Sequence, residues 1–369
     1  MNVKSIELDF FRNYVHLDCA FSPDVNVIYG ENAQGKTNLL EAVAYLSTAS
    51  SHRARYDREL IQFGVGSGFL KAQVFSRERD FTLEARLARG ARRQLFSNGV
   101  RLKTAGELSG ILNTVLFCPE DLSLIRDGAA ARRRFLDDCI CQLRPRYAAA
   151  LAEYRKLYEH KTRILRDWEE KPSLLDTLDE FSLRMAQTGA ILIHYRAHFI
   201  RRLKDHAPAI HADFSGGREI LSLSYETVKT VTDPEAPARE ILPQLLAHQE
   251  SHRRAELESR QCLSGPHKDD LTVLLDGISA KDYASQGQTR TAALSLKLGC
   301  REIFQQETGE WPVLLLDDVL SELDHRRQEF VLNRISGGQV FITCCEDDTV
   351  QGLDQGAAFH IHGGKVVGG

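Results

Sequence analysis

The stretch 28–38 places the strongest constraint on what this chain can fold into. It is Ile-Tyr-Gly-Glu-Asn-Ala-Gln-Gly-Lys-Thr-Asn, which contains a glycine, four further residues and then Gly-Lys-Thr. Glycines at these two places let backbone N–H groups point at phosphate oxygens, at the positive end of the helix that follows. An apolar, β-prone segment at 25–29 precedes the stretch, and Leu39, Val43 and Leu46 follow it at helical spacing. The sequence therefore predicts a strand, a phosphate-binding loop and a helix.

Each residue type in such a loop has its own task. We expect Lys36 to contact the β and γ phosphates of ATP, and the hydroxyl of Thr37 to bind Mg²⁺. The remaining loop positions are predicted to surround the phosphates with backbone N–H groups: Gly30, Glu31, Asn32, Ala33, Gln34 and Gly35.

A second candidate metal ligand follows a fully apolar run at 313–316. Such a run is typical of a central parallel strand, and it ends in Asp317 and Asp318. Asp317 is predicted to bind the Mg²⁺ of ATP, and Asp318 to orient the attacking water or accept its proton. Two aspartates at a strand end also occur as turn residues. Their combination with a phosphate loop favours the metal site.

The tetrapeptide Ser285-Gln286-Gly287-Gln288 precedes a helix that we predict at 291–306. It combines a hydroxyl, a glycine that permits close approach and a helix N-terminus, which are again the features needed to contact a phosphate. By itself the tetrapeptide is also compatible with a simple N-cap. Its occurrence together with the phosphate loop and the two aspartates makes it specific.

Composition and charge restrict the class of protein further. With 369 residues, 43% hydrophobic and 27% charged, the chain is typical of a soluble protein of about two to three domains. It has no run of about eighteen apolar residues and carries charges near its N-terminus, so it is expected in the cytoplasm, without a membrane span. Its eight cysteines form no Cys-x-x-Cys pair and indicate reduced thiols. The net charge of −4 means that any DNA contact must come from local patches.

The pattern along the chain predicts three regions. Residues 1–123 are β-rich, with alternation at 81–87 and an Asn-Gly turn at 98–99, and residues 263–369 have α/β character. Between them, 124–262 is helical: apolar positions recur every three or four residues at 151–168 and 178–199, and a third helical segment follows at 238–262. This periodicity fits a short coiled coil or an ordinary amphipathic packing face. Because the phosphate loop and Asp317 must lie side by side, the outer regions are expected to form one head with 124–262 inserted as a helical arm.

These motifs, in this order, resemble the ABC-type ATPase heads of the SMC and Rad50 class, and more closely the RecF family. The resemblance covers nearly the whole chain and implies an α/β fold: a P-loop ATPase head of ABC type, with a mixed sheet, an antiparallel β subdomain and an inserted helical arm. It rests also on Phe-Arg-Asn-Tyr at 11–14, Ser-His-Arg at 51–53, Pro-Glu-Asp-Leu at 119–122, Arg-Arg-Phe-Leu-Asp at 133–137, Gly-Pro-His-Lys-Asp-Asp-Leu at 265–271 and Leu-Leu-Leu-Asp-Asp-Val-Leu-Ser-Glu-Leu-Asp at 314–324.

The resemblance further implies a homodimer that closes on ATP. In it, residues 285–288 would face the γ-phosphate held by the partner's loop, and the segment from Ser321 to Asp324 would line the interface. The implied function is ATP-dependent DNA binding in recombinational repair and replication-fork maintenance. The protein would bind single-stranded and duplex DNA at gaps and help RecO and RecR to load the RecA recombinase, which supports the SOS response.

The implied enzymatic activity is a weak, DNA-stimulated ATPase used as a conformational switch. Asp318 stands where many ABC ATPases carry a glutamate, whose side chain is one methylene longer. Misplacement by about an ångström can cost about a hundredfold in rate. Slow hydrolysis is therefore expected. A histidine that often follows the next strand in this class is absent, because Thr343 is followed by Cys344 and Cys345.

The densest basic run is Arg132-Arg133-Arg134, which we predict to contact DNA phosphates. The alternative is that Arg133 and Arg134 pair with Asp137 and Asp138, four residues along the same helix face. The sequence offers no recognition helix and no basic patch interleaved with aromatic residues, so base-specific recognition is not expected.

Two other functions fit a nucleotide-binding head. One is the ATPase subunit of a membrane transporter, which the long helical insertion and the lack of a coupling segment disfavour. The other is a structural DNA tether like SMC, for which the inserted helices are too short.

Overall fold

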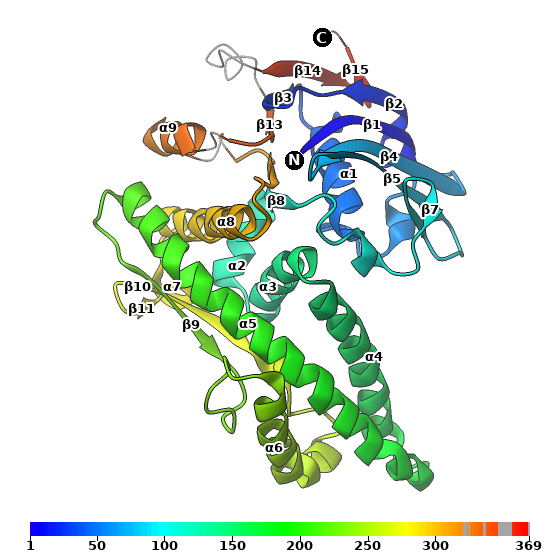
Figure 1. The fold of residues 1–369 in the computed structure, drawn as a ribbon, viewed down its shortest axis with the longest axis vertical. Coiled ribbons are helices and arrows are strands. Elements are labelled where there is room, and N and C mark those ends of the chain that lie inside the picture. Colours follow the sequence, from blue (N-terminus) through cyan, green and yellow to red (C-terminus); the bar gives the residue numbers. More distant parts are fainter. Residues whose placement is uncertain (320–322, 324, 335–336, 346–355, 368–369) are drawn as a thin grey trace. The chain divides into compact units, whose positions relative to one another are not determined.

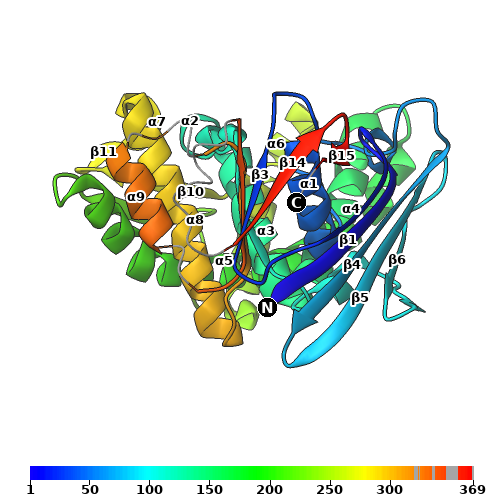
Figure 2. The ribbon, with the colours of Figure 1, turned by 90° about the horizontal axis from the view of Figure 1, so that it is seen from above.

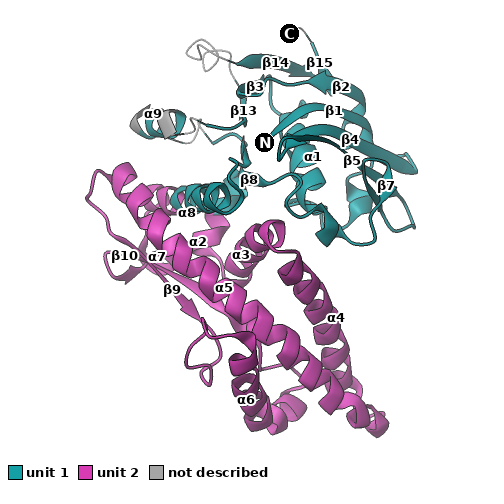
Figure 3. Cartoon of the chain, viewed as in Figure 1, with its two compact units in different colours: residues 1–121, 293–369 teal, residues 122–292 magenta. Residues whose placement is uncertain are grey.

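Residues from both ends of the chain form one of the two units of the fold. The computed structural model describes residues 1–319, 323, 325–334, 337–345 and 356–367. Unit 1 comprises Met1–Asp121 and Ala293–Gly369, and unit 2 comprises Leu122–Ala292 (Figure 3).

A mixed six-stranded sheet in unit 1 carries the predicted phosphate loop (Figure 1). Its neighbours pair in parallel except at the β14–β15 edge, which is an antiparallel hairpin. All four residues of β12 are buried, which confirms the predicted central strand. Because β3, β12, β13 and β8 run in the same direction, their carboxyl ends lie along one edge of the sheet. In spatial order, the strands are β15 (Lys365–Val366), β14 (Ala357–His362), β3 (Val25–Tyr29), β13 (Val340–Cys344), β12 (Val313–Leu316) and β8 (Thr114–Phe117).

The second sheet of unit 1 is antiparallel, as predicted for the N-terminal region. Leu83, Ala85 and Leu87 are buried on one face of β5, and the Asn-Gly turn at 98–99 joins β6 to β7. In spatial order, the strands are β2 (Tyr14–Ala20), β1 (Asn2–Phe11), β4 (Ser67–Ser76), β5 (Arg79–Ala88), β6 (Gln94–Ser97) and β7 (Val100–Arg101).

Helix α1 (Lys36–Thr48), which begins within the phosphate loop, packs between the two sheets (Figure 2). Leu39 and Tyr45 belong to the same buried apolar cluster as Leu70 of the antiparallel sheet and Phe341 of the mixed sheet. The start of α1 is thereby fixed against both sheets. The other elements of unit 1 are η1 (Asp57–Glu59), η2 (Ala105–Leu108) and α9 (His325–Arg334). Two elements cross the unit boundary: η3 (Pro119–Leu122) begins in unit 1 and ends in unit 2, and α8 (Gln286–Thr308) begins in unit 2 and ends in unit 1.

Unit 2 contains the predicted long helices and a small sheet. The helices predicted around 151–168, 178–199 and 238–262 are present as α4, α5 and α6. Helix α5 ends where Gly216 takes a φ of 65° and the N–H of Gly217 donates to Ala212 O, which satisfies a terminal carbonyl. The antiparallel sheet β11-β10-β9 includes a strand at 221–226 that the helical pattern did not predict. The elements are α2 (Ser123–Arg126), α3 (Ala129–Leu143), α4 (Pro145–Asp167), η4 (Pro172–Thr177), α5 (Leu178–Ser215), β9 (Leu221–Glu226), α6 (Ala238–Ser259), η5 (Pro266–Lys268), β10 (Asp270–Leu275), β11 (Ile278–Ser279) and α7 (Ala280–Tyr283).

A buried ionic network joins several elements of unit 2. Arg196 of α5 donates to Asp137 of α3 at 2.8 Å and to Asp269, just before β10, at 2.9 Å. Tyr147 and Tyr225 donate their hydroxyls to the same two carboxylates. Removing one partner from such a network costs about 3–5 kcal/mol because the remaining charge is left unpaired. The network therefore fixes how α3, α5 and β10 pack.

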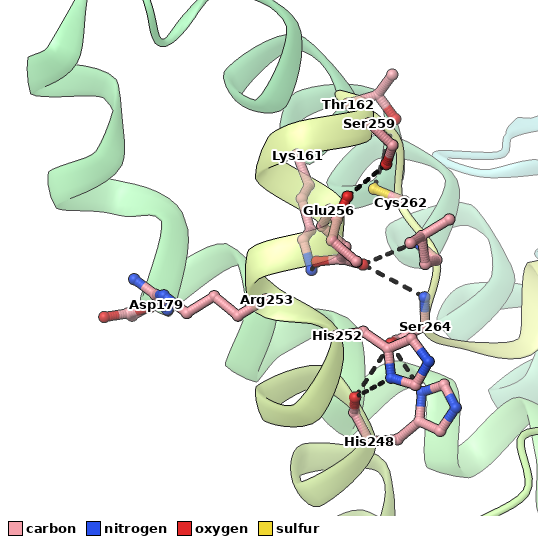
Figure 4. A network of polar contacts seen from close by, with 12 residues as sticks. Lys161, Thr162, Asp179, His248, His252, Arg253, Glu256, Ser259, Cys262 and Ser264 are labelled. Carbon is pink, nitrogen blue, oxygen red and sulfur yellow. Dashed lines mark hydrogen bonds and ion pairs between the residues drawn. The ribbon is translucent and has the colours of Figure 1, made fainter.

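A second buried ion pair connects α4 and α6 (Figure 4). Lys161 Nζ lies 2.7 Å from Glu256 Oε2, and both side chains are almost completely buried. The other oxygen of Glu256 accepts the backbone N–H of Leu263 at 2.8 Å, and His248 is hydrogen-bonded to Ser264. These contacts attach the segment after α6 to the two helices.

All eight cysteines are free thiols, of which Cys345 is exposed.

The environment of His267 predicts how the stability of the fold depends on pH. Its Nδ1 lies 2.7 Å from the hydroxyl of Tyr154 and its Nε2 3.0 Å from Cys262 O, an arrangement that suits a neutral ring. Burial lowers the pKa of His267 to about 4, from 6.5 in the open chain. The unfolded chain therefore takes up a proton below pH 6.5 that the folded protein does not, and stability falls as pH falls toward 4, by at most about 1.4 kcal/mol per pH unit.

The substitution His267→Gln is expected to remove this dependence, because an amide can make both hydrogen bonds without titrating. The free energy of unfolding, measured by denaturant titration between pH 7 and pH 4, should fall less steeply in this variant than in the wild type. The exposed His362→Gln serves as the matched control and should follow the wild type. Equal slopes in wild type and His267→Gln would contradict the assignment.

Candidate nucleotide-binding site

The predicted phosphate loop joins β3 to α1 in a conformation that only glycine tolerates at its two ends. Gly30 has a φ of 143°, and a Cβ there would lie 2.4 Å from Ile361 O. Gly35 has a φ of 121°, and a Cβ there would lie 2.7 Å from Asn13 Nδ2. Positive φ and close packing both exclude larger side chains. The loop therefore has the backbone shape that the glycine spacing predicted.

Side chains from the β1–β2 turn hold this loop in place. Asn13 Nδ2 donates to Gln34 O at 2.7 Å, and the Tyr14 hydroxyl donates to Gly35 O at 2.9 Å. The N–H of Gly364, in the turn between β14 and β15, also donates to Gln34 O, at 3.1 Å. From the sequence alone, the Phe-Arg-Asn-Tyr motif at 11–14 indicates only a family resemblance. Its structural role is to support the loop.

Lys36 lies over the loop that precedes it. Its Nζ donates to Gly30 O at 2.6 Å and to Glu31 O at 2.9 Å, and the side chain is buried. Glu31, Asn32 and Ala33, at the top of the loop, are exposed. The ammonium group is thus held at the centre of the loop, where a phosphate chain would bind.

Thr37 and Asp317 meet although they are 280 positions apart. The Thr37 hydroxyl donates to Asp317 Oδ1 at 2.9 Å. Thr343 on β13, which the sequence did not identify as a site residue, also donates to Asp317 Oδ1, at 2.8 Å, and its oxygen accepts the N–H of Asp318. Asp318 has a φ of 51°, which is uncommon outside glycine and is typical of functional sites.

Burial raises the pKa of Asp317, while the hydrogen bonds from Thr343 and Thr37 act in the opposite direction. A divalent metal ion beside a buried carboxylate would favour its charged form. The donor set of carboxylate and hydroxyl oxygens is the one that Mg²⁺ prefers.

Two more acidic residues follow β8 at the same edge of the sheet. Asp317 N donates to Phe117 O at 2.9 Å, so the segment after β8 begins beside the aspartate. Asp121 is engaged by Lys297 Nζ at 2.9 Å, whereas Glu120 is exposed. On the other side, Cys345 Sγ lies 3.1 Å from Asn32 Oδ1 of the loop. The segment with Glu120 and Asp121 thus lies beside Asp317, and Cys345 lies beside the phosphate loop. These residues were not assigned to the site from the sequence.

The predicted signature residues belong to unit 2 and form a helix N-cap. Ser285 Oγ accepts the N–H of Gln288 at 3.3 Å, and Gln288 Oε1 accepts the N–H of Ser285 at 2.9 Å, which is a reciprocal capping box. Helix α8 therefore starts at Gln286 and not at Thr291, so the predicted start was wrong: Gln286, Gly287 and Gln288 form its first turn. Ser285 is exposed, at the positive end of a 23-residue helix.

The three arginines predicted to contact DNA lie in different environments on α3. Arg132 is buried and forms two hydrogen bonds with Asp270, at 2.6 and 2.8 Å. Arg133 is half-buried and donates to Asp269 O, and Arg134 is exposed. The guanidinium of Arg132 thus stabilises the fold.

The predicted interface residue Asp324 lies outside the described residues, as does Ser321.

The fold and the site together define an ABC-type P-loop ATPase head. Its features are a strand that leads into a glycine loop, a lysine over that loop, and a Thr–Asp contact at the edge of a parallel sheet. The family model for the RecF/RecN/SMC N terminal domain matches residues 2–365. The DNA replication and repair protein RecF of Agathobacter rectalis is 40% identical over 369 residues, which cover 99% of each chain. The chain belongs to the RecF family.

Solved structures agree with this assignment. The recombination mediator protein RecF-ATPrS of the RecFOR pathway matches with a TM-score of 0.91 and 34% identity, over 99% of this chain and 97% of that one. The Smc head domain of Pyrococcus furiosus shares the fold, with a TM-score of 0.56 and 17% identity over 99% and 95%. Among the helices of the described residues, none has the length and apolarity needed to cross a membrane.

Proposed function

We propose that this chain is an ATP-switched DNA-binding protein of recombinational repair and replication-fork maintenance. The observation that carries the proposal is the contact between Thr37 and Asp317, which joins the phosphate loop to the end of β12. Related support comes from two RecF structures, one with ATP and one with ATPrS, and from relatives named as DNA replication and repair proteins.

In this proposal each site residue has a distinct role. Lys36 and the backbone N–H groups of 30–37 bind the ATP phosphates, and Thr37 with Asp317 holds Mg²⁺. The metal supplies charge neutralisation at the phosphates. Asp318 orients the attacking water, and its short side chain makes ATP hydrolysis slow. DNA stimulates this hydrolysis, and the change between the ATP-bound and ATP-free states acts as a conformational switch. Ser285, Gln286, Gly287 and Gln288 contact the nucleotide bound by a second copy, and Asp324 lies at that interface.

The proposed division of labour follows the sequence regions: residues 1–123 and 263–369 act as the ATPase head and 124–262 as an inserted arm. The pairing of strands from both ends of the chain in one sheet supports the head, whereas residues 263–292 pack with the helices in unit 2, so the packing boundary lies after 292 and not after 262. The partners are single-stranded and duplex DNA, a second copy of the chain, and RecO, RecR and RecA, all in the cytoplasm. Arg134 is the exposed member of the 132–134 run and the one available to DNA.

The test is to measure self-association and DNA affinity with ATP and with no nucleotide. Sedimentation velocity should show a shift from monomer to dimer with ATP, and fluorescence anisotropy should show tighter binding of gapped DNA. A protein whose association state and DNA affinity are both indifferent to ATP is not a switch of this kind. Absence of DNA binding under every condition would favour the transporter-type alternative.

A further inference from the structure

The segment that follows α1, residues 51–60, is rigidly held in unit 1. Ser51 Oγ donates to Glu41 of α1 and accepts the N–H groups of Arg53 and Ala54, at 3.0 and 2.8 Å. Asp57 accepts the hydroxyl of Tyr45 at 3.0 Å and is paired with Arg93 at 3.1 Å. The backbone of this segment is thus fixed from several sides. Its exposed side chains project from an ordered support.

Three of these exposed side chains form a cluster: Arg55, Tyr56 and Arg58. The guanidinium carbons of Arg55 and Arg58 lie 5.3 and 4.7 Å from the centre of the Tyr56 ring, which is 47% exposed. In the part of the chain that the structure describes, neither guanidinium has a carboxylate within ion-pair distance. The expectation that no basic patch is interleaved with an aromatic residue is therefore wrong for this segment.

Other cation–aromatic pairs of the same unit show what is unusual about the Arg55–Tyr56–Arg58 cluster. Lys4 lies 5.2 Å from the ring centre of Phe75, but its ammonium is paired with Asp80 at 2.6 Å. Arg86 lies 4.5 Å from the ring centre of Phe96 and is paired with Glu84 at 3.1 Å. In those pairs the positive charge is already neutralised. In the Arg55–Tyr56–Arg58 cluster two positive charges remain available to an anionic partner.

We propose that the Arg55–Tyr56–Arg58 cluster binds single-stranded nucleic acid, with a base stacked on Tyr56 and the two arginines on the flanking phosphates. This deepens the proposed function and rests on it. An aromatic ring next to uncompensated arginines is the combination that binds unpaired strands without sequence preference. A duplex offers phosphates but keeps its bases stacked inside, so it would use the arginines alone. A contribution of Tyr56 stacking to the affinity therefore distinguishes binding of single-stranded nucleic acid from binding of a duplex.

Hydrogen bonds connect the segment that carries this cluster to the phosphate loop. Arg53 Nη1 donates to Asn38 Oδ1 at 3.1 Å, and Asn38 Nδ2 donates to Asn13 Oδ1 at 2.8 Å. Asn13 in turn donates to Gln34 O within the loop. A nucleotide that changes the conformation of the loop would therefore act, through these hydrogen bonds, on the segment that carries the cluster. Binding of the strand is expected to depend on ATP for this reason.

The test measures the affinity of the full chain for fluorescein-labelled oligo-dT by anisotropy, with ATP present. Tyr56→Leu is expected to weaken binding by about 5- to 150-fold, which corresponds to the stacking of one base. Tyr56→Phe keeps the ring and should bind like the wild type. Arg55→Gln together with Arg58→Gln should lower the slope of log Kd against log salt by about 0.7 for each phosphate that an arginine no longer neutralises.

The matched control is Phe75→Leu, which removes a partly exposed ring beside a cation that is already paired with Asp80. It should leave the affinity unchanged. Equal binding by Tyr56→Leu and wild type, or equally weakened binding by Tyr56→Leu and Phe75→Leu, would overturn the proposal. Cross-linking of 5-iodouracil DNA to the wild-type chain, followed by mass spectrometry, gives an answer even if a variant does not fold: the cross-link should fall within 53–58. If the wild type does not bind DNA at all, the proposed function fails instead.

Discussion

Lys36→Ala is expected to weaken ATP binding by at least about a hundredfold. Lys36 supplies the positive charge at the centre of the loop, and hydrogen bonds to charged groups contribute about 1.5–3 kcal/mol each. Its Nζ donates to Gly30 O and Glu31 O, so the side chain is already aligned with the loop axis. Little rearrangement is then needed to reach the β and γ phosphates. Isothermal titration calorimetry with ATP and with ADP measures the change in affinity for each nucleotide.

The control for Lys36→Ala is a lysine of the same unit that lies on the surface. Lys71 on β4 is paired with Glu7 at 3.1 Å and is partly exposed, so Lys71→Ala should bind ATP like the wild type. Thermal unfolding of both variants shows whether removing the two hydrogen bonds to carbonyl oxygens destabilises the fold. An unchanged nucleotide affinity in a folded Lys36→Ala protein would remove the central assignment of the site.

The local parts of this site could be predicted from the sequence because their geometry depends on neighbouring residues. Gly30 and Gly35 are required by the backbone of a single loop, and the apolar run at 313–316 shows directly that Asp317 follows a central strand. The phosphate loop and the strand end are each short, contiguous segments. The contact between Thr37 and Asp317 was then expected from the prediction that both residues bind one metal ion, and the two side chains are hydrogen-bonded.

The supporting residues could not be predicted because their roles depend on which strands become neighbours. Thr343 reaches Asp317 only because β13 pairs with β12 in the sheet. Asn13 and Tyr14 support the loop through a sheet that the loop does not belong to. A hydroxyl in the otherwise apolar strand at 340–344 was the one available indication for Thr343.

The prediction for the basic run 132–134 shows the same limit. Consecutive arginines on a helix point in different directions, so one of the three faces the interior. Arg132 is satisfied by Asp270, a residue 138 positions away that the i, i+4 pairing with Asp137 or Asp138 did not anticipate. Asp137 is instead bound by Arg196. By contrast, the cluster at 55–58 is contiguous in sequence, but only the structure shows that, among the described residues, neither of its guanidinium groups is ion-paired and that the neighbouring Glu59 carboxylate accepts the backbone N–H of Arg55 instead.

Ser285→Arg is expected to abolish ATP-driven dimerisation while leaving nucleotide binding by the monomer intact. Ser285 is exposed at the start of α8, and its hydroxyl caps the first turn of that helix, which faces an anion in the proposed dimer. An arginine there would occupy the space of the partner's γ-phosphate and remove the N-cap, which itself contributes about 1 kcal/mol. Sedimentation velocity with ATP measures the dimer fraction, and calorimetry measures the ATP affinity of the monomer.

Two further variants distinguish the loss of the helix cap from steric or electrostatic obstruction of the shared ATP site. Asparagine is as good an N-cap as serine, so Ser285→Asn should keep the start of α8 and retain dimerisation to within about tenfold. Ser285→Asp also caps the helix, but it places a negative charge against the triphosphate and should fail to dimerise. If arginine, aspartate and asparagine at this position all dimerise with ATP as the wild type does, then Ser285 does not face a nucleotide and the two ATP sites are not shared between copies. If only the arginine variant fails and aspartate behaves like asparagine, the effect is steric, and the phosphate contact assigned to Ser285 is wrong.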